Sequence, residues 1–137
     1  MARTFTLEVV TPDRRVFSEP VTFFSVRGAA GELGVLPGHI PLFTTLAPGL
    51  LHFKRDNGEQ GVLTVMGGFL NVQPDRATVL AEVAERGEDL DEVRARAAKE
   101  RAEAQLSRQH DVQSELALQR AILRLRAFEV LGMHARR

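Results

Sequence analysis

The sequence changes character near residue 87, and this change constrains the fold more than any other feature. Nine of the eleven glycines and all six prolines lie between residues 12 and 74. In that part of the chain, short runs of β-branched and aromatic residues alternate with turn residues, from FTLEVV at the start to ATVLAEVA at the end. So many interruptions exclude long helices, and they favour an all-β sandwich or a flattened barrel over residues 1–87.

The rest of the chain, residues 88–137, is patterned for two helices. Asp89 followed by Glu92 resembles a capping box, which predicts the start of the first helix. Asp111 is expected to cap a second helix that ends at Gly132. Because only a short linker separates the helices, we expect an antiparallel hairpin. The predicted fold class is β plus α, an N-terminal β-sandwich followed by a C-terminal antiparallel two-helix hairpin.

Two glycine motifs predict how the strands connect. Asn57-Gly58 lies between two strand-like runs, and this dipeptide favours a type I′ turn with both residues at positive φ. The runs on either side should therefore pair as antiparallel neighbours. Gly67-Gly68 could indicate a phosphate contact, but no helix start follows it. We expect a β-bulge or a tight strand bend there instead.

The first predicted helix carries a stripe of small residues. Ala95, Ala98 and Ala102 recur at three- and four-residue spacing, and Leu106 continues the stripe. Small side chains let a second helix approach closely, but they bury little apolar area. We therefore expect a weakly held hairpin, which can come apart when a better contact is offered.

Charge and composition exclude several classes of function. Eighteen basic and eighteen acidic residues give a net charge of zero, so no global field attracts nucleic acid or an anionic membrane. The chain has no cysteine, which excludes disulfides and thiolate metal sites. Its apolar runs are interrupted by Gly, Pro and His, and the N-terminus lacks the layout of a signal peptide. We therefore expect neither direct membrane insertion nor export by that route.

Signals for catalysis are also missing. None of the four histidines stands at the HxH or HxxxH spacing of a metal site. The chain contains neither a nucleophile elbow nor a GxxxxGK phosphate loop. Glu32 and His39, in the stretch GELGVLPGHIPLFT, could act as acid and base, but turn and surface positions explain them better. We expect no catalytic residue, no metal site and no required cofactor.

Three segments together closely resemble a known family. They are GELGVLPGHIPL at 31–42, MGGFLNVQP at 66–74 and LDEVRARAAKERAE at 90–103. Their order and sequence are similar to those of the epsilon subunit of bacterial F-type ATP synthases, and the match extends over nearly the whole chain. The resemblance implies a non-catalytic central-stalk subunit of a proton-translocating enzyme. Its β-sandwich would join the gamma subunit to the ring of c subunits, and its helical hairpin would restrain ATP hydrolysis.

The resemblance assigns a role to the first of these segments. Residues that match Glu32 and His39 face the polar loops of the c ring in the family, which implies a docking loop. Pro37 and Pro41 would stiffen this loop before the partner arrives, and so reduce the entropy lost on binding. The alternative is that the loop only maintains the fold.

LDEVRA, at 90–95, is similar to the family's ATP-binding pattern. The resemblance gives as matching positions Glu85, Leu90, Asp91, Arg94, Ala95, Arg120 and Arg124. Arg120 and Arg124 are one helical turn apart, so a folded hairpin could bring them near Arg94 to hold a triphosphate. ATP would then be a regulatory ligand, because no general base or set of magnesium ligands accompanies it. The alternative is a plain helix start, in which Asp91 offsets the helix dipole and pairs with Arg94.

Two functions from different classes follow. The resemblance favours a stalk subunit that is peripheral to the cytoplasmic face of the bacterial cell membrane. Its partners would be the gamma subunit, the c ring and, through the C-terminal helices, the catalytic alpha and beta subunits. The residues alone would also allow a free-standing β-sandwich binding module that dimerises through its helical hairpin. A tight one-to-one complex with a coiled-coil gamma subunit would separate the first function from the second.

Overall fold

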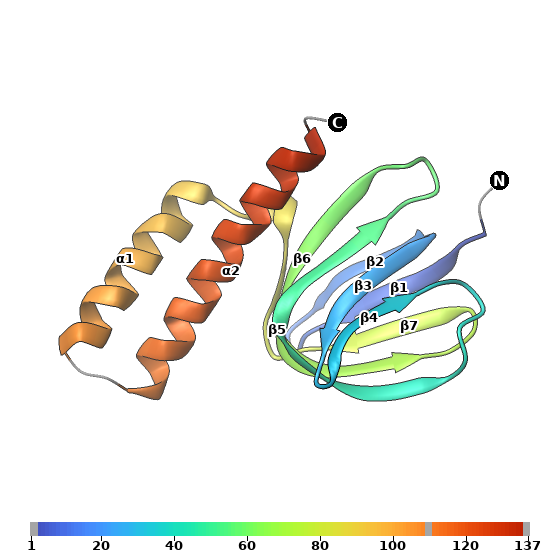
Figure 1. Ribbon diagram of the computed structural model, residues 1–137, viewed down its shortest axis with the longest axis horizontal. Coiled ribbons are helices and arrows are strands. Elements are labelled where there is room, and N and C mark those ends of the chain that lie inside the picture. The colour runs from blue at the N-terminus through green and yellow to red at the C-terminus, as the bar shows by residue number, and fades with distance from the viewer. Residues whose placement is uncertain (1–2, 109–110, 136–137) are drawn as a thin grey trace.

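The computed structural model describes residues 3–108 and 111–135, which form a β-sandwich followed by two helices (Figure 1). In chain order the elements are β1 (Phe5–Val10), β2 (Arg15–Val21), β3 (Phe23–Gly28), β4 (Gly31–Val35), β5 (Leu42–Lys54), β6 (Gln60–Val72), β7 (Arg76–Leu80), β8 (Ala84–Arg86), the 3-10 turn η1 (Gly87–Asp89), α1 (Glu92–Arg108) and α2 (Val112–Ala135). The predicted fold class is confirmed.

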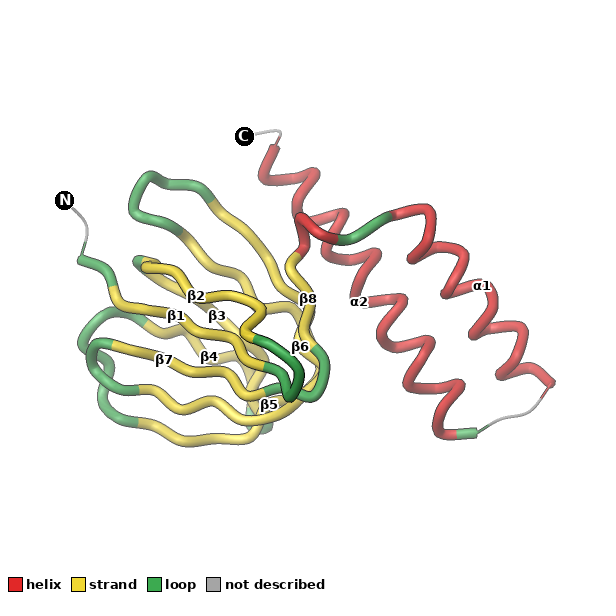
Figure 2. Tube along the Cα trace, turned by 180° about the vertical axis from the view of Figure 1, so that it is seen from behind, coloured by secondary structure: helices red, strands yellow, loops and turns green. Residues whose placement is uncertain are grey.

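The strands form a sheet that folds back on itself. The strand order is β2-β1-β7-β6-β5-β3-β4, and β8 lies beside β6. β1 and β7 are parallel, whereas the other paired strands are antiparallel. The first part of β6 pairs with β8 and its last part pairs with β7. β5 and β6 therefore run together from one layer of the sandwich into the other (Figure 2).

The predicted bend in β6 lies at Gly67 and Gly68. Their φ angles are 89° and 120°, values that residues with a side chain rarely adopt. A Cβ atom on Gly68 would also collide with the carbonyl oxygen of Leu80 on β7. Glycine meets both requirements, so β6 can bend here while it stays paired with β5.

The sandwich makes its own core. On β1, for example, Phe5, Leu7 and Val9 point inward and are buried, because alternate residues of a strand face opposite sides. Among the described residues, the buried cluster between the layers extends from Phe5 to Ala84 and includes no residue of either helix. The sandwich therefore closes its core without the hairpin.

The turn between β5 and β6 differs from the predicted one. The two strands are antiparallel neighbours, as expected, but Asn57 has a negative φ and only Gly58 is positive, at 90°. The predicted type I′ turn is therefore wrong. The backbone N–H of Arg55 donates to the carbonyl of Glu59 at 2.8 Å, and the Asn57 side chain accepts from the N–H of Glu59 at 2.9 Å. An asparagine side chain can stabilise a turn in this way without positive φ.

The two helix starts match the prediction in one case and differ in the other. Asp111 caps α2, because its carboxylate accepts from the backbone N–H of Ser114 at 2.7 Å. α1 is capped by Asp91, whose carboxylate accepts from the N–H of Arg94 at 3.2 Å. The predicted cap at Asp89 is wrong, since this residue ends η1 instead. Two aspartates within three residues offer the same capping chemistry, and the 3-10 turn selects the second.

The end of α2 also differs from the prediction. The helix passes through Gly132 and continues to Ala135. A glycine inside a helix disfavours it by only about 1 kcal/mol relative to alanine, and it forms a C-cap when it takes the left-handed conformation. Gly132 has no positive φ, so the predicted C-cap is wrong.

α1 and α2 form the predicted antiparallel hairpin, and α2 lies between α1 and the sandwich (Figure 1). The buried residues of α1 are the alanines Ala95 and Ala102, and Ala121 and Ala127 of α2 also have no exposed surface. The hairpin contacts the sandwich mainly through α2 and β6. Because these small side chains bury little apolar area, the packing supports the interpretation of a weakly held hairpin.

A chain that ends at Gly87 is expected to fold. Its buried core is complete, and the truncation removes only the cover that α2 gives to β6. Circular dichroism should show a β-sheet spectrum, and thermal unfolding should be cooperative. A random-coil spectrum for the truncated chain would mean that the sandwich depends on the helices.

Candidate functional site

A cleft lies where the start of α1 meets β8 and α2. Its volume is about 540 Å³. The lining residues come from β8, from the turn before α1, from α1 itself and from α2: Glu85, Asp89, Leu90, Asp91, Val93, Arg94, Ala95, Ala97, Ala98, Arg101 and Arg124. This space is termed the hairpin cleft.

One ion pair in the hairpin cleft joins the hairpin to the sandwich. Arg124 of α2 donates from Nε to Oε1 of Glu85 on β8 at 2.8 Å, and both side chains are 29% exposed. A partly exposed pair of this kind contributes at most about 1 kcal/mol. The guanidinium uses only its Nε–H in this bond, so it retains other donors that an anion could accept.

Arg94 and Arg101 add further positive charge to the hairpin cleft. They are two helical turns apart on α1, so they lie on the same face, and both are exposed. Neither side chain forms an ion pair with another described residue. Guanidinium groups in such an arrangement favour a multiply charged anion, because each can donate two hydrogen bonds to a phosphate.

Asp91 is accounted for by the plain helix start. Its carboxylate accepts the backbone N–H of Arg94, which caps α1 and offsets the helix dipole. A helix start does not account for Arg94, Arg101 and Arg124, which line one cleft from two different helices. The two interpretations of LDEVRA are therefore compatible: the aspartate caps the helix, and the arginines stay available for a ligand.

The structure brings most of the residues that the resemblance assigns to ATP around the hairpin cleft: Glu85, Leu90, Asp91, Arg94, Ala95 and Arg124. It does not bring Arg120 there, since this residue lies one turn earlier on α2 and does not line the cleft. Arg101 does line it, although no motif pointed to this residue. The signal in the sequence is its seven-residue spacing from Arg94, which places both on one helix face.

The structure does not bring Glu32 and His39 together: Glu32 lies at the start of β4, beside the β3–β4 turn, and His39 lies in the connection from the other end of β4 to β5. Glu32 is exposed on β4, an edge strand, and not in a loop as predicted. His39 is partly exposed, and its Nδ1 is 2.6 Å from the carbonyl oxygen of Ile40. The backbone N–H of Gly38 donates to the carbonyl of Pro74 at 2.9 Å, which holds the turn against the sandwich. Residues 31–42 are termed the docking segment.

The tip of the docking segment is apolar. Leu36 is 60% exposed and Ile40 is 76% exposed, and they flank Pro37, Gly38 and His39. A tip that is stiffened by proline and held by a backbone hydrogen bond loses little entropy when it binds. The tip of the docking segment therefore offers a preformed surface, with an imidazole and two apolar side chains.

The sandwich also exposes a group of apolar side chains on one outer face. Val10, Leu80 and Phe69 are paired across β1, β7 and β6, so their side chains point to the same side. Phe43 of β5 stacks on Phe69 with ring centroids 5.7 Å apart. Phe43 is 64% exposed, and Phe69 and Leu80 are each 46% exposed. These four residues are termed the apolar row, and such a surface indicates a site for another protein.

The signal for the apolar row was present in the sequence. Each of its residues stands next to a core residue, in the pairs Val9-Val10, Leu42-Phe43, Phe69-Leu70 and Val79-Leu80. Two adjacent apolar residues break the alternation of a strand with one solvated face, so both faces are apolar at these points. No prediction from the sequence included the apolar row.

Residues 3–108 and 111–135 contain neither a metal site nor a membrane-spanning helix. In this part of the chain, no group of three or more His, Asp or Glu side chains is placed to hold a metal ion. No helix there is long and apolar enough to cross a membrane.

The chain is similar to known proteins over almost its whole length. Residues 4–87 match the family described as ATP synthase, Delta/Epsilon chain, beta-sandwich domain, and residues 88–129 match the one described as ATP synthase, Delta/Epsilon chain, long alpha-helix domain. A chain in the cryo-EM structure of Euglena gracilis mitochondrial ATP synthase, OSCP/F1/c-ring in rotational state 1, has 27% sequence identity and a TM-score of 0.66, with 95% of this chain and 80% of that chain covered.

A second solved structure supports the fold alone. A chain in the cryo-EM structure of the central stalk and c-ring of Tetrahymena thermophila mitochondrial ATP synthase has 14% identity and a TM-score of 0.53. The match covers 70% of this chain and 72% of that chain. At this identity the likeness says nothing about individual site residues.

Proposed function

This chain belongs to the delta/epsilon family of ATP synthase subunits, and from that premise we propose that it couples and regulates the rotor of a bacterial proton-translocating F-type enzyme. It is a non-catalytic subunit. The observation that carries the proposal is a sandwich with a complete core and exposed partner surfaces, followed by a hairpin that adds nothing to that core. Such a chain can stay attached through its sandwich while its hairpin moves. The family favours this function over a free-standing module that dimerises through its hairpin.

We assign the apolar row to the gamma subunit. A permanent partner within a rotor can cover an apolar surface throughout the working cycle, and long-lived interfaces are the more apolar ones. The row spans four neighbouring strands, β1, β7, β6 and β5, so a long helical partner could lie across it.

We assign the docking segment to the c ring. Its carboxylate and imidazole, on Glu32 and His39, suit the polar loops that such a ring presents. Leu36 and Ile40 would add apolar contacts at the tip. A subunit that holds gamma with one surface and the ring with another transmits torque between them. It would work peripherally, at the cytoplasmic face of the cell membrane.

We assign the hairpin to regulation. In an extended state, its arginine-bearing second helix would reach the catalytic alpha and beta subunits and restrain ATP hydrolysis. In the folded state, Arg94, Arg101 and Arg124 surround a cleft with room for a nucleotide. ATP bound there would favour the folded state, and it can shift the population only by the difference in its affinity for the two states. ATP would therefore act as a regulatory ligand that relieves inhibition.

The assignment of the apolar row predicts weaker gamma binding by two variants. Phe69→Ser and Leu80→Ser should each reduce the affinity by roughly tenfold or more, because a buried side chain of this size contributes on the order of 1.5–3 kcal/mol. The sandwich should stay folded, since both side chains are already 46% exposed. Leu116→Ser on α2 is the matched control, because Leu116 is also 46% exposed. Titration of the purified subunits gives the affinities, and equal values for all three variants would place gamma elsewhere.

The assignment of the docking segment predicts a loss of coupling. Replacement of Glu32 and His39 by alanine should leave the sandwich folded and the complex assembled, but it should lower ATP synthesis driven by a proton gradient in membrane vesicles. Glu100→Ala on α1 removes a comparable exposed carboxylate and should leave synthesis unchanged. Wild-type synthesis by the double variant, with normal assembly, would remove the docking role.

The assignment of the hairpin cleft predicts a specific pattern of ATP affinities. Loss of a charge-assisted phosphate contact costs on the order of 1.5–3 kcal/mol, so Arg101→Ala and Arg124→Ala should each weaken ATP binding at least roughly tenfold. Arg120→Ala, which changes an arginine outside the cleft, should bind nearly as the wild type does. Glu85→Gln breaks the ion pair with Arg124 but keeps the guanidinium of Arg124. This variant therefore distinguishes the effect of losing the ion pair from the effect of losing the contact between Arg124 and phosphate.

Two measurements decide this prediction. Calorimetry of the isolated chain with ATP gives the affinities, and absence of binding would leave LDEVRA as a helix start only. Hydrolysis by the assembled enzyme gives the regulatory effect: rising ATP should relieve inhibition, and Arg124→Ala should need more ATP for the same relief. Deletion of the hairpin after Gly87 should raise hydrolysis most at low ATP concentration, where the bound ligand does not yet relieve inhibition. Unchanged hydrolysis after this deletion would show that the hairpin does not inhibit.

A further inference from the structure

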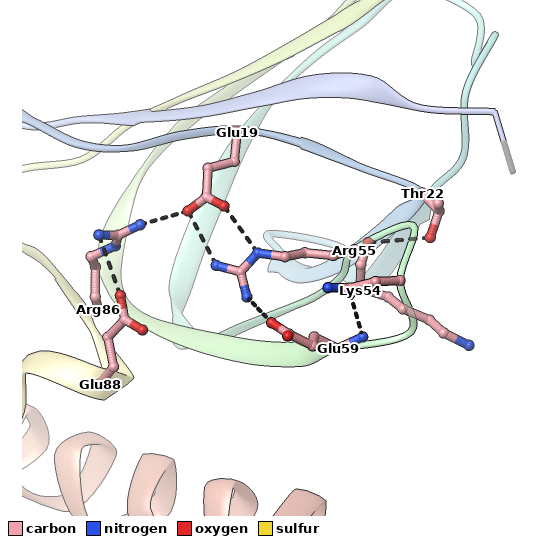
Figure 3. Close-up of polar contacts among 8 residues, drawn as sticks. Glu19, Thr22, Lys54, Arg55, Glu59, Arg86 and Glu88 are labelled. Atoms are coloured by element: carbon pink, nitrogen blue, oxygen red, sulfur yellow. Dashed lines mark hydrogen bonds and ion pairs between the residues drawn. The ribbon is translucent and has the colours of Figure 1, made fainter. Parts of the chain in front are cut away.

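A network of charged side chains surrounds the junction between the sandwich and the hairpin (Figure 3). Its centre is Glu19 of β2, which accepts hydrogen bonds from Arg55 at 2.9 and 3.1 Å and from Arg86 at 2.7 Å. Arg55 also pairs with Glu59 at 3.3 Å, and Arg86 pairs with Glu88 at 3.3 Å. One carboxylate thus holds two guanidinium groups, one from the β5–β6 turn and one from β8.

Two aromatic rings support the network. The guanidinium of Arg86 lies 5.1 Å from the ring centroid of Phe17, and that of Arg55 lies 5.0 Å from the centroid of Phe53. The two rings are themselves 4.7 Å apart. Cation–π contacts of this kind stabilise an arginine in one orientation. The hydrogen bond from Arg55, with the charges of both arginines, holds the pKa of Glu19 below its usual range, so the carboxylate is ionised at neutral pH.

Neighbouring residues of β8 attach it to different parts of the molecule. Arg86 is bound to the sandwich through Glu19, whereas Glu85 is bound to the hairpin through Arg124. Adjacent side chains of a strand point to opposite faces, which explains why one short strand can hold both. β8 is also paired with β6 through its backbone. The two attachments are unequal, since Arg86 belongs to a supported network and Glu85 forms a single ion pair.

The residues directly after β8 contact the sandwich closely, whereas those that follow them make fewer bonds to it. Gly87 is buried, and a side chain there would collide with Val62 of β6 and crowd Leu131 of α2. Glu88 is tied back to Arg86. Leu90 is extended, with φ −85° and ψ 149°, and lies between η1 and the cap of α1. The backbone N–H of Leu90 donates to the carbonyl of Gly87 at 3.2 Å, but no side chain of residues 89–91 bonds to the sandwich network.

We infer that β8 is a clasp, in which Arg86 fixes the strand to the sandwich while Glu85 holds the hairpin releasably. When the hairpin leaves, the Glu85–Arg124 pair breaks, β8 stays in the sheet, and residues 89–91 serve as the hinge. This inference rests on the proposed movement of the hairpin, and it adds the position in the chain at which the fixed part ends and the moving part begins. Arg86 is a positioning residue in this device, because it acts on the hairpin only through the strand that it holds.

Hydrogen exchange of the full, isolated chain tests the clasp. In the wild type, the amides of β8 should exchange as slowly as those of β6, and the amides of both helices should exchange faster. Arg86→Gln should accelerate exchange in β8 by roughly tenfold or more, because it removes a charge-assisted bond, while β1 and β7 keep wild-type rates. Arg124→Gln is the matched control: it should accelerate the helices and leave β8 unchanged.

The outcomes separate the clasp from the proposed function. Two results would overturn the clasp even if the hairpin moves. In the first, the β8 amides of the wild type exchange at the rate of the helices. In the second, Arg86→Gln leaves the exchange of β8 unaltered. Helices that exchange as slowly as the sandwich would count against hairpin release, while acceleration of β8 in Arg86→Gln would still support its fixation by Arg86. Should Arg86→Gln fail to fold, Arg86→Lys keeps the charge but loses the planar fork, and it should accelerate β8 in the same direction by a smaller factor.

Discussion

Burial of apolar side chains between the two layers of the sandwich is the interaction on which the rest of the structure depends. The cluster that begins at Phe5 and ends at Ala84 is closed by strands alone. Its closure requires β5 and β6 to pass from one layer to the other, and the glycines at 67 and 68 make that bend sterically accessible. Because the core is complete, the hairpin is left with a separate and weaker interface of its own.

The proposed movement of the hairpin depends on the weakness of that second interface. The buried side chains of α1 are alanines, and one partly exposed ion pair, Arg124 with Glu85, joins α2 to β8. Three arginines line the cleft at this interface, two of them without an ion pair to another described residue. Guanidinium groups favour a bound phosphate. Under the proposed function, an anion bound among them would favour the folded state of the hairpin.

The sequence predicted the elements whose signals are local. Glycine and proline density placed the strands, the short linker between two helical segments predicted the hairpin, and Asp111 predicted the start of α2. The wrong predictions concern turns and helix caps, where alternative local conformations have similar free energies. Asn57 stabilises its turn through its side chain instead of a positive φ, and of the two acidic candidates the chain uses Asp91, not Asp89, as the cap.

The candidate sites were only partly accessible to sequence reasoning, because they combine residues that are distant in the chain. Glu19, Arg55 and Arg86 meet only after three strands have assembled, and no motif marks them. Arg101 left a signal in its seven-residue spacing from Arg94, and the apolar row left one in the adjacent apolar residues of its strands. Both signals can be interpreted once the faces of α1 and of the sheet are known. The family resemblance supplied the assignment to ATP, which stays a proposal; Arg101 lines the hairpin cleft and Arg120 does not.

The central claim is that the sandwich stays fixed on the rotor while the hairpin moves, and a distance within the assembled enzyme tests it most directly. The chain has no cysteine, so spin labels can be attached at Asp56→Cys in the β5–β6 turn and at Glu103→Cys on α1, both exposed positions. Without ATP, pulsed electron resonance should show two populations of distances, one of them matching the folded chain. ATP should enrich that folded population. A single distance equal to that of the folded chain, unchanged by ATP, would contradict a moving hairpin.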